Sequence, residues 1–164
     1  MRVAILTVSD KGSRGEREDK SGEAIQEIVI EMGGEVTEWN VIPDEQDQIA
    51  KSLRQMAASA DLVLTTGGTG IAARDVTPEA TLSIVDKEVP GIAEAMRVQT
   101  LSITPMAMLS RAVAGVRGKC LIINLPGSPG AVQECLDVIS KAVPHAVEII
   151  RGEVTEHPVP APKK

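Results

Sequence analysis

Aromatic residues are almost absent from this chain of 164 residues, which contains one tryptophan, Trp39, and neither phenylalanine nor tyrosine. This absence disfavours a nucleic-acid partner whose bases stack on aromatic rings. The net charge of −6 points the same way, although it permits a locally basic pocket. The hydrophobic core must therefore be aliphatic.

Cysteine and histidine are also scarce. Cys120 and Cys135 lie in apolar strand and helix patterns, and we interpret them as buried free thiols. His145 and His157 are far from any Cys/His cluster, which disfavours a zinc site. No apolar segment is long enough for a signal peptide or a membrane span, so we expect a cytoplasmic protein without a membrane partner.

Alternating strand and helix patterns predict an α/β fold, a three-layer αβα sandwich with a mostly parallel central sheet. We expect one domain over residues 1–152 and a flexible C-terminal tail over residues 153–164. The predicted strands are Val3–Val8, Val36–Ile42, Leu62–Thr66 and Cys120–Leu125. The predicted helices begin at Ser21 as N-cap, at Gln46, at Thr77 as N-cap, near Ile92, at Pro105 (through Ala112) and at Ser128 (through Ile150). Residues 11–20 are interpreted as a functional loop or a lid.

A glycine turn follows the third predicted strand. Gly67, Gly68, Thr69 and Gly70 include three glycines, which allow positive φ angles and leave backbone N–H groups accessible to an anion. A helix start at Thr77-Pro78 comes shortly after. A glycine turn between a strand and a helix N-terminus is typical of a phosphate site. No Walker A lysine follows the turn, so the chain is not a P-loop enzyme.

Asp75 follows the same turn and would repel a phosphate by about 4 kcal/mol at about 4 Å if the effective dielectric is near 20. Two interpretations stay open: Asp75 caps backbone donors, or it binds a Mg²⁺ ion that also binds the phosphate. Asp44 could likewise be only a helix N-cap. Because Asp10, Asp44 and Asp75 each follow a strand, they are expected at one edge of the sheet, which favours a metal–phosphate site. The cations nearest in sequence, Arg74 and Arg111, could neutralise a phosphate or be solvated surface residues.

Several motifs occur in a fixed order along nearly the whole chain. They are VAILTVSD at residues 3–10, DKSG at 19–22, IPDE at 42–45, LTTGGTG with RDVTPEAT at 64–81, ITPMAMLSRAVAGVRG at 103–118, and LIINLPGSPGAV at 121–132. In these motifs the chain resembles the molybdopterin adenylyltransferases of the Mog/MoaB type, which also occur as a domain of gephyrin. The combination of TGGTG with RDVTPEAT is far more specific than a lone glycine triplet.

The resemblance implies an α/β enzyme that forms a homotrimer. It implies Mg²⁺-dependent transfer of AMP from ATP to the terminal phosphate of molybdopterin, with release of pyrophosphate and hand-over of the product to a molybdate-inserting enzyme. Asp44 and Asp75 match the two critical aspartates, and Gly67 to Gly70 match the phosphate-binding loop. Further matches are a serine near the bound nucleotide and pterin phosphate, Ser110, and the pocket positions Ser9, Asp10, Glu79, Pro126, Gly127 and Ser128. Ser110 lies in a helical pattern, and the position of Ser128 varies in the family.

Three alternative functions remain open at this point. The chain could be a pterin-binding carrier without catalysis, a scaffold like the gephyrin domain in its larger context, or another nucleotide-cleaving enzyme of this fold, such as a pyrophosphatase acting on ADP-ribose. The carboxylates Asp44 and Asp75 disfavour the carrier, because a carrier has no need of a metal site. Consumption of ATP with release of pyrophosphate would distinguish the transferase from all three.

Overall fold

A computed structural model describes residues 1–154, so that most of the expected tail, residues 155–164, lies outside the described part of the chain. The strands are β1 (Arg2–Val8), β2 (Glu35–Ile42), β3 (Leu62–Thr66), β4 (Lys87–Glu88), β5 (Ala114–Arg117) and β6 (Cys120–Leu125). The helices are α1 (Asp10–Ser13), α2 (Lys20–Glu31), α3 (Gln46–Ala57), α4 (Thr77–Leu82), α5 (Pro90–Thr100), the 3₁₀ helix η1 (Pro105–Leu109), α6 (Pro129–Ile139) and α7 (Val143–Arg151). Within residues 1–154, no helix is long and apolar enough to cross a membrane.

The six strands form one sheet in the order β2-β1-β3-β6-β5-β4. The four strands β2, β1, β3 and β6 run parallel, as the sequence predicts, and all four predicted strands are present. β5 and β4 extend the sheet with antiparallel pairing and were not predicted. β5 is too short to show a strand pattern in the sequence. It forms a hairpin with β6 through a tight turn at Gly118, whose φ is +55°.

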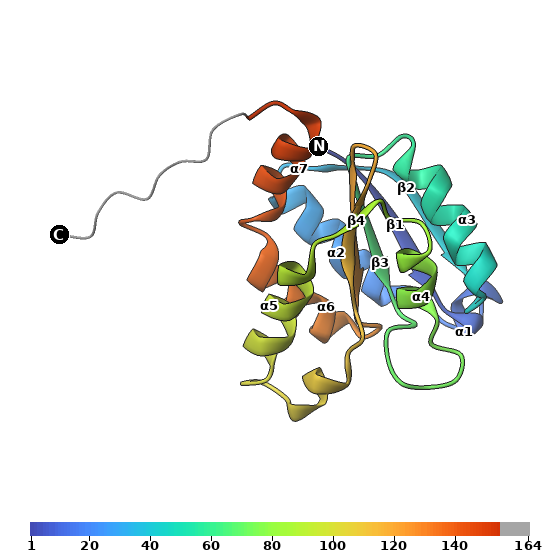
Figure 1. Cartoon of the computed structure of the whole chain (residues 1–164). Helices are drawn as coiled ribbons and strands as arrows, with labels where there is room; N and C mark the ends of the chain where they lie inside the picture. Colours follow the sequence, from blue (N-terminus) through green and yellow to red (C-terminus); the bar gives the residue numbers. More distant parts are fainter. Residues whose placement is uncertain (155–164) are drawn as a thin grey trace.

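Helices cover both faces of the sheet, which confirms the three-layer sandwich (Figure 1). Alternate residues of a strand face opposite sides, so that Val3 and Ile5 join one buried cluster and Ala4 and Leu6 join the other. The first cluster is completed by α2, α5, α6 and α7, and the second by α3 and α4. Both clusters are aliphatic, as the near-absence of aromatic residues requires.

Three helix predictions were wrong in detail. The helix α2 is capped by Asp19, whose carboxylate accepts from the Gly22 N–H at 2.9 Å, and not by Ser21. The last predicted helix is two helices, α6 and α7, because Pro144 lacks the N–H that a continuous helix would need there. The predicted helix from Pro105 is only the 3₁₀ helix η1, and Ser110 follows it in an extended conformation with ψ of 123°.

Both cysteines are free and buried, as predicted. Burial raises the pKa of the Cys120 thiol to about 12 and that of Cys135 to about 11. Because a thiolate is the reactive form, these thiols are inert at neutral pH and serve as small core residues.

Candidate active site

The site is built on the carboxyl ends of β1 and β3, where the chain order reverses along the parallel strands and α/β sheets usually bind ligands. The glycine turn follows β3 directly, with φ angles of +92° at Gly67 and +65° at Gly68. A methyl group on Gly67 would clash with the Val8 carbonyl oxygen, and one on Gly68 would clash with the Thr77 hydroxyl. Only glycine fits at these two positions, both because of the φ angles and because of the close approach.

Neighbouring elements hold the turn from two sides. The Thr77 hydroxyl donates to the Gly67 carbonyl at 2.9 Å, and the Thr77 N–H donates to the Gly68 carbonyl at 3.0 Å. Thr77 is thus the first residue of α4 and ties α4 to the turn, instead of capping the helix as the sequence suggested. On the other side, the Thr66 hydroxyl donates to the Pro126 carbonyl at 2.7 Å, which joins the ends of β3 and β6.

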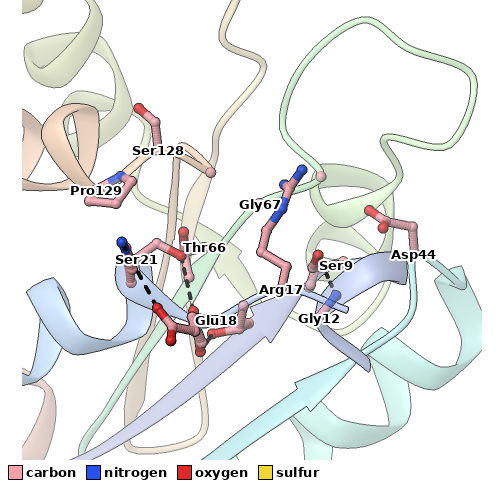
Figure 2. Close-up of a pocket in the computed structure, with 16 residues that line it drawn as sticks. Ser9, Gly12, Arg17, Glu18, Ser21, Asp44, Thr66, Gly67, Ser128 and Pro129 are labelled. Carbon is pink, nitrogen blue, oxygen red and sulfur yellow. Dashed lines mark hydrogen bonds and ion pairs between the residues drawn. The ribbon is translucent and has the colours of Figure 1, made fainter. Parts of the chain in front are cut away.

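A cavity of about 580 Å³ opens on one side of the turn (Figure 2). Six of the predicted site residues line it: Ser9, Asp44, Gly67, Gly68, Gly127 and Ser128. Ser9 also caps α1, because its hydroxyl accepts from the Gly12 N–H at 3.1 Å. Ser128 caps α6 in the same way, through the Ala131 N–H at 3.3 Å. Both hydroxyls therefore have a local structural role as well as a place in the cavity wall.

A second cavity, of about 420 Å³, also borders the turn. Its lining includes the predicted residues Gly68, Thr69, Gly70, Asp75, Ser110, Pro126 and Gly127. Gly68 and Gly127 line both cavities, so the two cavities adjoin at the glycine turn. The predicted residues thus form two neighbouring groups, with Asp44 in the first cavity and Asp75 in the second.

Asp10 lines neither cavity and is held by an arginine instead. Both of its carboxylate oxygens accept from Arg74, at 2.8 and 3.1 Å, and Arg74 also donates to Glu45 at 2.9 Å. The Arg74 guanidinium and a backbone hydrogen bond from Asp44 keep the pKa of Asp10 below its ordinary value. Asp10 and Arg74 therefore tie the segment before Asp75 to the ends of β1 and β2.

Asp44 contacts Asp10 and also lines the first cavity. It is not a helix cap: α3 is preceded by Glu45, with no side-chain cap, and Asp44 accepts from the Asp10 N–H at 2.9 Å through Oδ2. Its Oδ1 accepts no hydrogen bond within residues 1–154 and would lie 3.2 Å from a methyl group on Gly68. Burial raises the pKa of Asp44, and the negative charges of Asp10 and Asp75 raise it further, against the hydrogen bond from Asp10. A cation at this carboxylate would relieve that repulsion.

Asp75 caps a backbone donor, which is one of the two interpretations that the sequence left open. Its Oδ2 accepts from the Ala72 N–H at 2.9 Å, so the side chain caps a backbone donor. Among the described residues, no donor reaches its Oδ1. A methyl group on Gly70 would lie 2.8 Å from Oδ2, which shows how closely the carboxylate approaches the glycine turn. One oxygen therefore shapes the loop, and the other is available to a ligand.

The two aspartates fit a magnesium site that is completed by a substrate. Within residues 1–154, no group of three or more His, Cys, Asp or Glu side chains could hold a metal ion by itself. Mg²⁺ commonly binds one or two carboxylates together with phosphate oxygens and water, and does not need an all-protein cage. Asp44 and Asp75 provide that number of carboxylates beside the glycine turn.

Arg111 and Glu79 line neither of these two cavities. Arg111 donates to the Gly70 carbonyl at 2.7 Å and to the Asp75 carbonyl at 2.6 Å, and it forms a close ion pair with Glu79. This ion pair keeps the pKa of Glu79 below its ordinary value. Arg111 therefore holds both ends of the Gly70–Asp75 loop, and Glu79 holds Arg111.

The sequence indicated a functional loop over residues 11–20 but singled out none of the residues 17–21, which form a part of the cavity wall. Its centre is Asp19, which accepts four hydrogen bonds: from the Thr7 hydroxyl at 2.5 Å, Trp39 Nε1 at 2.8 Å, the Ser21 hydroxyl at 3.1 Å and the Gly22 N–H at 2.9 Å. Asp19 could have been predicted as the N-cap of α2, because aspartate is a preferred N-cap residue and accepts from the N–H three residues later. Its contact with Trp39 could not have been predicted, because the two residues belong to different elements.

Comparisons with known proteins show what this chain is similar to. The family described as "Probable molybdopterin binding domain" matches residues 4–145. A molybdopterin adenylyltransferase of Helicobacter pylori is 46% identical over 156 residues, which cover 93% of this chain and 89% of that protein. The protein of the same name from Escherichia coli K12 is 38% identical over 173 residues, 95% of this chain and 88% of that protein.

A solved structure has the same fold. The crystal structure of the molybdopterin biosynthesis enzyme MoaB from Thermus thermophilus matches with a TM-score of 0.87 and 53% identity, over 92% of this chain and 96% of that one. The glycine turn and the two aspartates lie inside the region that the family covers.

Proposed function

Because this chain belongs to the molybdopterin adenylyltransferase family of the Mog/MoaB type, we propose that it transfers AMP from ATP to the terminal phosphate of molybdopterin, in a Mg²⁺-dependent reaction that gives adenylylated molybdopterin and pyrophosphate. One observation carries the proposal: Asp44 and Asp75 lie in adjoining cavities that share Gly68 and Gly127. Two phosphate-bearing substrates can therefore meet at the glycine turn.

The chain contributes positioning and charge neutralisation. The glycine turn offers backbone N–H groups, and positive φ angles at Gly67 and Gly68 leave these groups unshielded by side chains. The phosphate of molybdopterin is already ionised near neutral pH, so its attack on ATP needs no strong general base. Holding the two phosphates together in the correct orientation then provides most of the rate enhancement.

Asp44 and Asp75 would hold the magnesium ion. The chemistry that Mg²⁺ supplies at such a site is the neutralisation of negative charge on ATP phosphate oxygens. The raised pKa of Asp44 supports this role, because burial and two neighbouring carboxylates outweigh the hydrogen bond from Asp10 and the charge of Arg74, and leave negative charge that is only partly offset. Arg74 relieves it only in part, because its guanidinium group is engaged by Asp10 and Glu45, and the guanidinium group of Arg111 is engaged by the Gly70 and Asp75 carbonyls.

We also propose that the chain forms a homotrimer and hands its product to a molybdate-inserting enzyme in the cytoplasm. The support for self-association is a row of exposed apolar side chains from the second half of α5 through η1. These are Val98, Leu101, Ile103, Met106, Met108 and Leu109, each at least 41% exposed. An apolar surface of this kind commonly marks a protein interface. Light scattering of the purified full-length chain tests the trimer.

The proposed activity is tested by incubating the chain with molybdopterin, ATP and Mg²⁺ and detecting the products by mass spectrometry. Adenylylated molybdopterin and an equal amount of pyrophosphate are expected, and neither should form when Mg²⁺ is chelated. A carrier or scaffold would bind molybdopterin and leave ATP intact. A pyrophosphatase would cleave ADP-ribose in the absence of ATP. Either of these outcomes would overturn the proposal.

A further inference from the structure

The loop after α1 places Arg17 over the 580 Å³ cavity. Arg17 lines the cavity, and Figure 2 shows its guanidinium end turned towards the side of Gly67. The side chain is exposed and has no hydrogen bond or ion pair within residues 1–154. Its neighbour Arg14 is also exposed, but it pairs with Glu16 at 2.8 Å and does not line the cavity.

The two other arginines near the glycine turn are already engaged. Arg74 donates to Asp10 and Glu45, and Arg111 donates to Gly70, Asp75 and Glu79. Lys20, which also lines the cavity, lies 3.9 Å from Glu18. Among the described arginines, Arg17 is therefore the one that lines the cavity beside Asp44 with all of its donors available.

The base of the loop is fixed although the Arg17 side chain is not. Two residues after Arg17, Asp19 is held by four hydrogen bonds, including those from Thr7 and Trp39. On the other side, Gly15 adopts a φ of +72° with no neighbour within 4 Å of a methyl group placed on it. The loop therefore joins an anchored end to an open turn, and Arg17 projects from between them.

A phosphate in this cavity would need a cation that is not already paired, because the cavity wall is acidic. It is lined by Asp44, Glu18 and Asp19 as well as by the glycine turn, and a phosphate that enters it brings further negative charge. A guanidinium group offers five donors in a planar fork that matches phosphate oxygens. The sequence suggested Arg74 and Arg111 for this role, but the guanidinium groups of both already donate to protein oxygens.

We propose that Arg17 binds a phosphate group of a substrate held against the Gly67–Gly68 turn, and that the arginines nearest the turn serve to position the loop instead. The identity of that substrate rests on the proposed function: the phosphate belongs either to ATP or to molybdopterin. The two sources share the same chemistry, and the experiment below separates them.

The test compares the full-length wild type with three variants: Arg17→Ala, Arg17→Lys and the matched control Arg14→Ala. Arg14→Ala removes the same charge from the same loop without changing the cavity wall. Calorimetry with inorganic tripolyphosphate measures phosphate binding without any reaction. Dissociation constants for ATP and for molybdopterin are then measured separately. A loss of roughly tenfold in affinity is expected for Arg17→Ala, because one charge-assisted contact at an exposed site is removed.

The expected pattern is weak tripolyphosphate binding by Arg17→Ala, partial recovery by Arg17→Lys and wild-type binding by Arg14→Ala. A loss confined to ATP assigns the phosphate to the nucleotide, and a loss confined to molybdopterin assigns it to the pterin. If Arg17→Ala and Arg14→Ala bind tripolyphosphate, ATP and molybdopterin equally well, Arg17 does not bind phosphate. If the wild type forms no adenylylated molybdopterin, the proposed function fails, while the tripolyphosphate comparison still decides the role of Arg17.

Discussion

Asp10 and Asp44 are joined by two reciprocal hydrogen bonds, in which the backbone N–H of each residue donates to the carboxylate of the other, at 2.9 and 3.1 Å. Two carboxylates in contact would repel each other, but Arg74 pairs with Asp10 and offsets its charge. Asp10 thereby fixes the backbone of Asp44 while leaving Oδ1 of Asp44 without a hydrogen-bond donor among the described residues. Asp10 is thus a positioning residue for Asp44, and not a part of either cavity wall.

This relationship predicts different effects for two substitutions of Asp10. Asp10→Asn keeps an oxygen that can accept from the Asp44 N–H and loses only the ion pair with Arg74. Asp10→Ala loses both. Because a hydrogen bond to a charged group contributes about 1.5 kcal/mol or more, AMP transfer should fall roughly tenfold in Asp10→Ala and only a few-fold in Asp10→Asn. Turnover at saturating ATP and molybdopterin measures this, and equal rates for the two variants would contradict the positioning role.

The charge on Asp44 should destabilise the folded chain at neutral pH. Its folded-state pKa is raised above the ordinary value of 3.8, first by burial. The protonated form is therefore favoured by folding, and its contribution to stability is present below pH 3.8 and lost as the pH rises through the folded value. Asp44→Asn should therefore raise the melting temperature at pH 7, while it abolishes activity.

The gain in melting temperature should shrink as the pH is lowered, because the raised pKa lets the wild-type Asp44 carboxyl take up a proton more readily in the folded chain than in the unfolded one. Thermal unfolding at pH 7 and at pH 4.5 measures both parts of this prediction. Asp137→Asn is the control, since Asp137 is exposed on α6 and lines neither cavity. A variant Asp44→Asn that is less stable than the wild type at pH 7 would show that the carboxylate stabilises the fold.

Gly67 should tolerate no side chain. Gly67→Ala combines an unfavourable φ of +92° with a clash against the Val8 carbonyl oxygen. Gly152→Ala is the matched control, because Gly152 has a φ of +79° but no neighbour within 4 Å of the added methyl group. The control should lose about 1 kcal/mol, and Gly67→Ala about 3 kcal/mol, which corresponds to roughly 2 to 4 °C and 6 to 12 °C in melting temperature. Equal losses would mean that the close approach to β1 is unimportant.

Arg111 should support AMP transfer indirectly, because it holds the backbone of Asp75 in position. In Arg111→Lys, a single ammonium group replaces the planar fork that reaches the Gly70 and Asp75 carbonyls. AMP transfer should fall roughly tenfold and should need more Mg²⁺ for half-maximal rate, because Asp75 is a proposed ligand of that ion. Arg117→Lys is the control, since Arg117 also donates to a backbone carbonyl, that of Ile84, away from the site. A fall in melting temperature with unchanged magnesium dependence would leave Arg111 with a role in stability alone.

Much of the fold could be predicted because its signals are local. The runs at Leu62–Thr66 and Cys120–Leu125 are buried strands, and the polar residues that follow the parallel strands do gather at one edge of the sheet. The pair β4 and β5 escaped prediction because such short strands show no periodicity. Ser110 was misplaced because an apolar spacing typical of a helix also fits a 3₁₀ turn followed by extended chain.

The chemistry of single charged residues was harder to predict than the fold. Arg74, Arg111 and Arg17 look alike in the sequence, yet two of them are engaged by protein oxygens and one has no partner in the described chain. Glu79 and Asp10 likewise hold arginines, and do not line either cavity. Which partner a charged side chain finds depends on contacts between distant segments, and no local pattern records those contacts.

The proposed magnesium site is tested most sharply by AMP transfer in the variant Asp75→Asn, followed by mass spectrometry over a range of Mg²⁺ concentrations. The amide retains an oxygen that can accept from the Ala72 N–H, so the loop should keep its shape and molybdopterin should still bind. We predict no adenylylated molybdopterin above background at any magnesium concentration, with an unchanged melting temperature. Turnover at the wild-type rate, with the wild-type magnesium requirement, would contradict the proposal that Asp75 holds the ion.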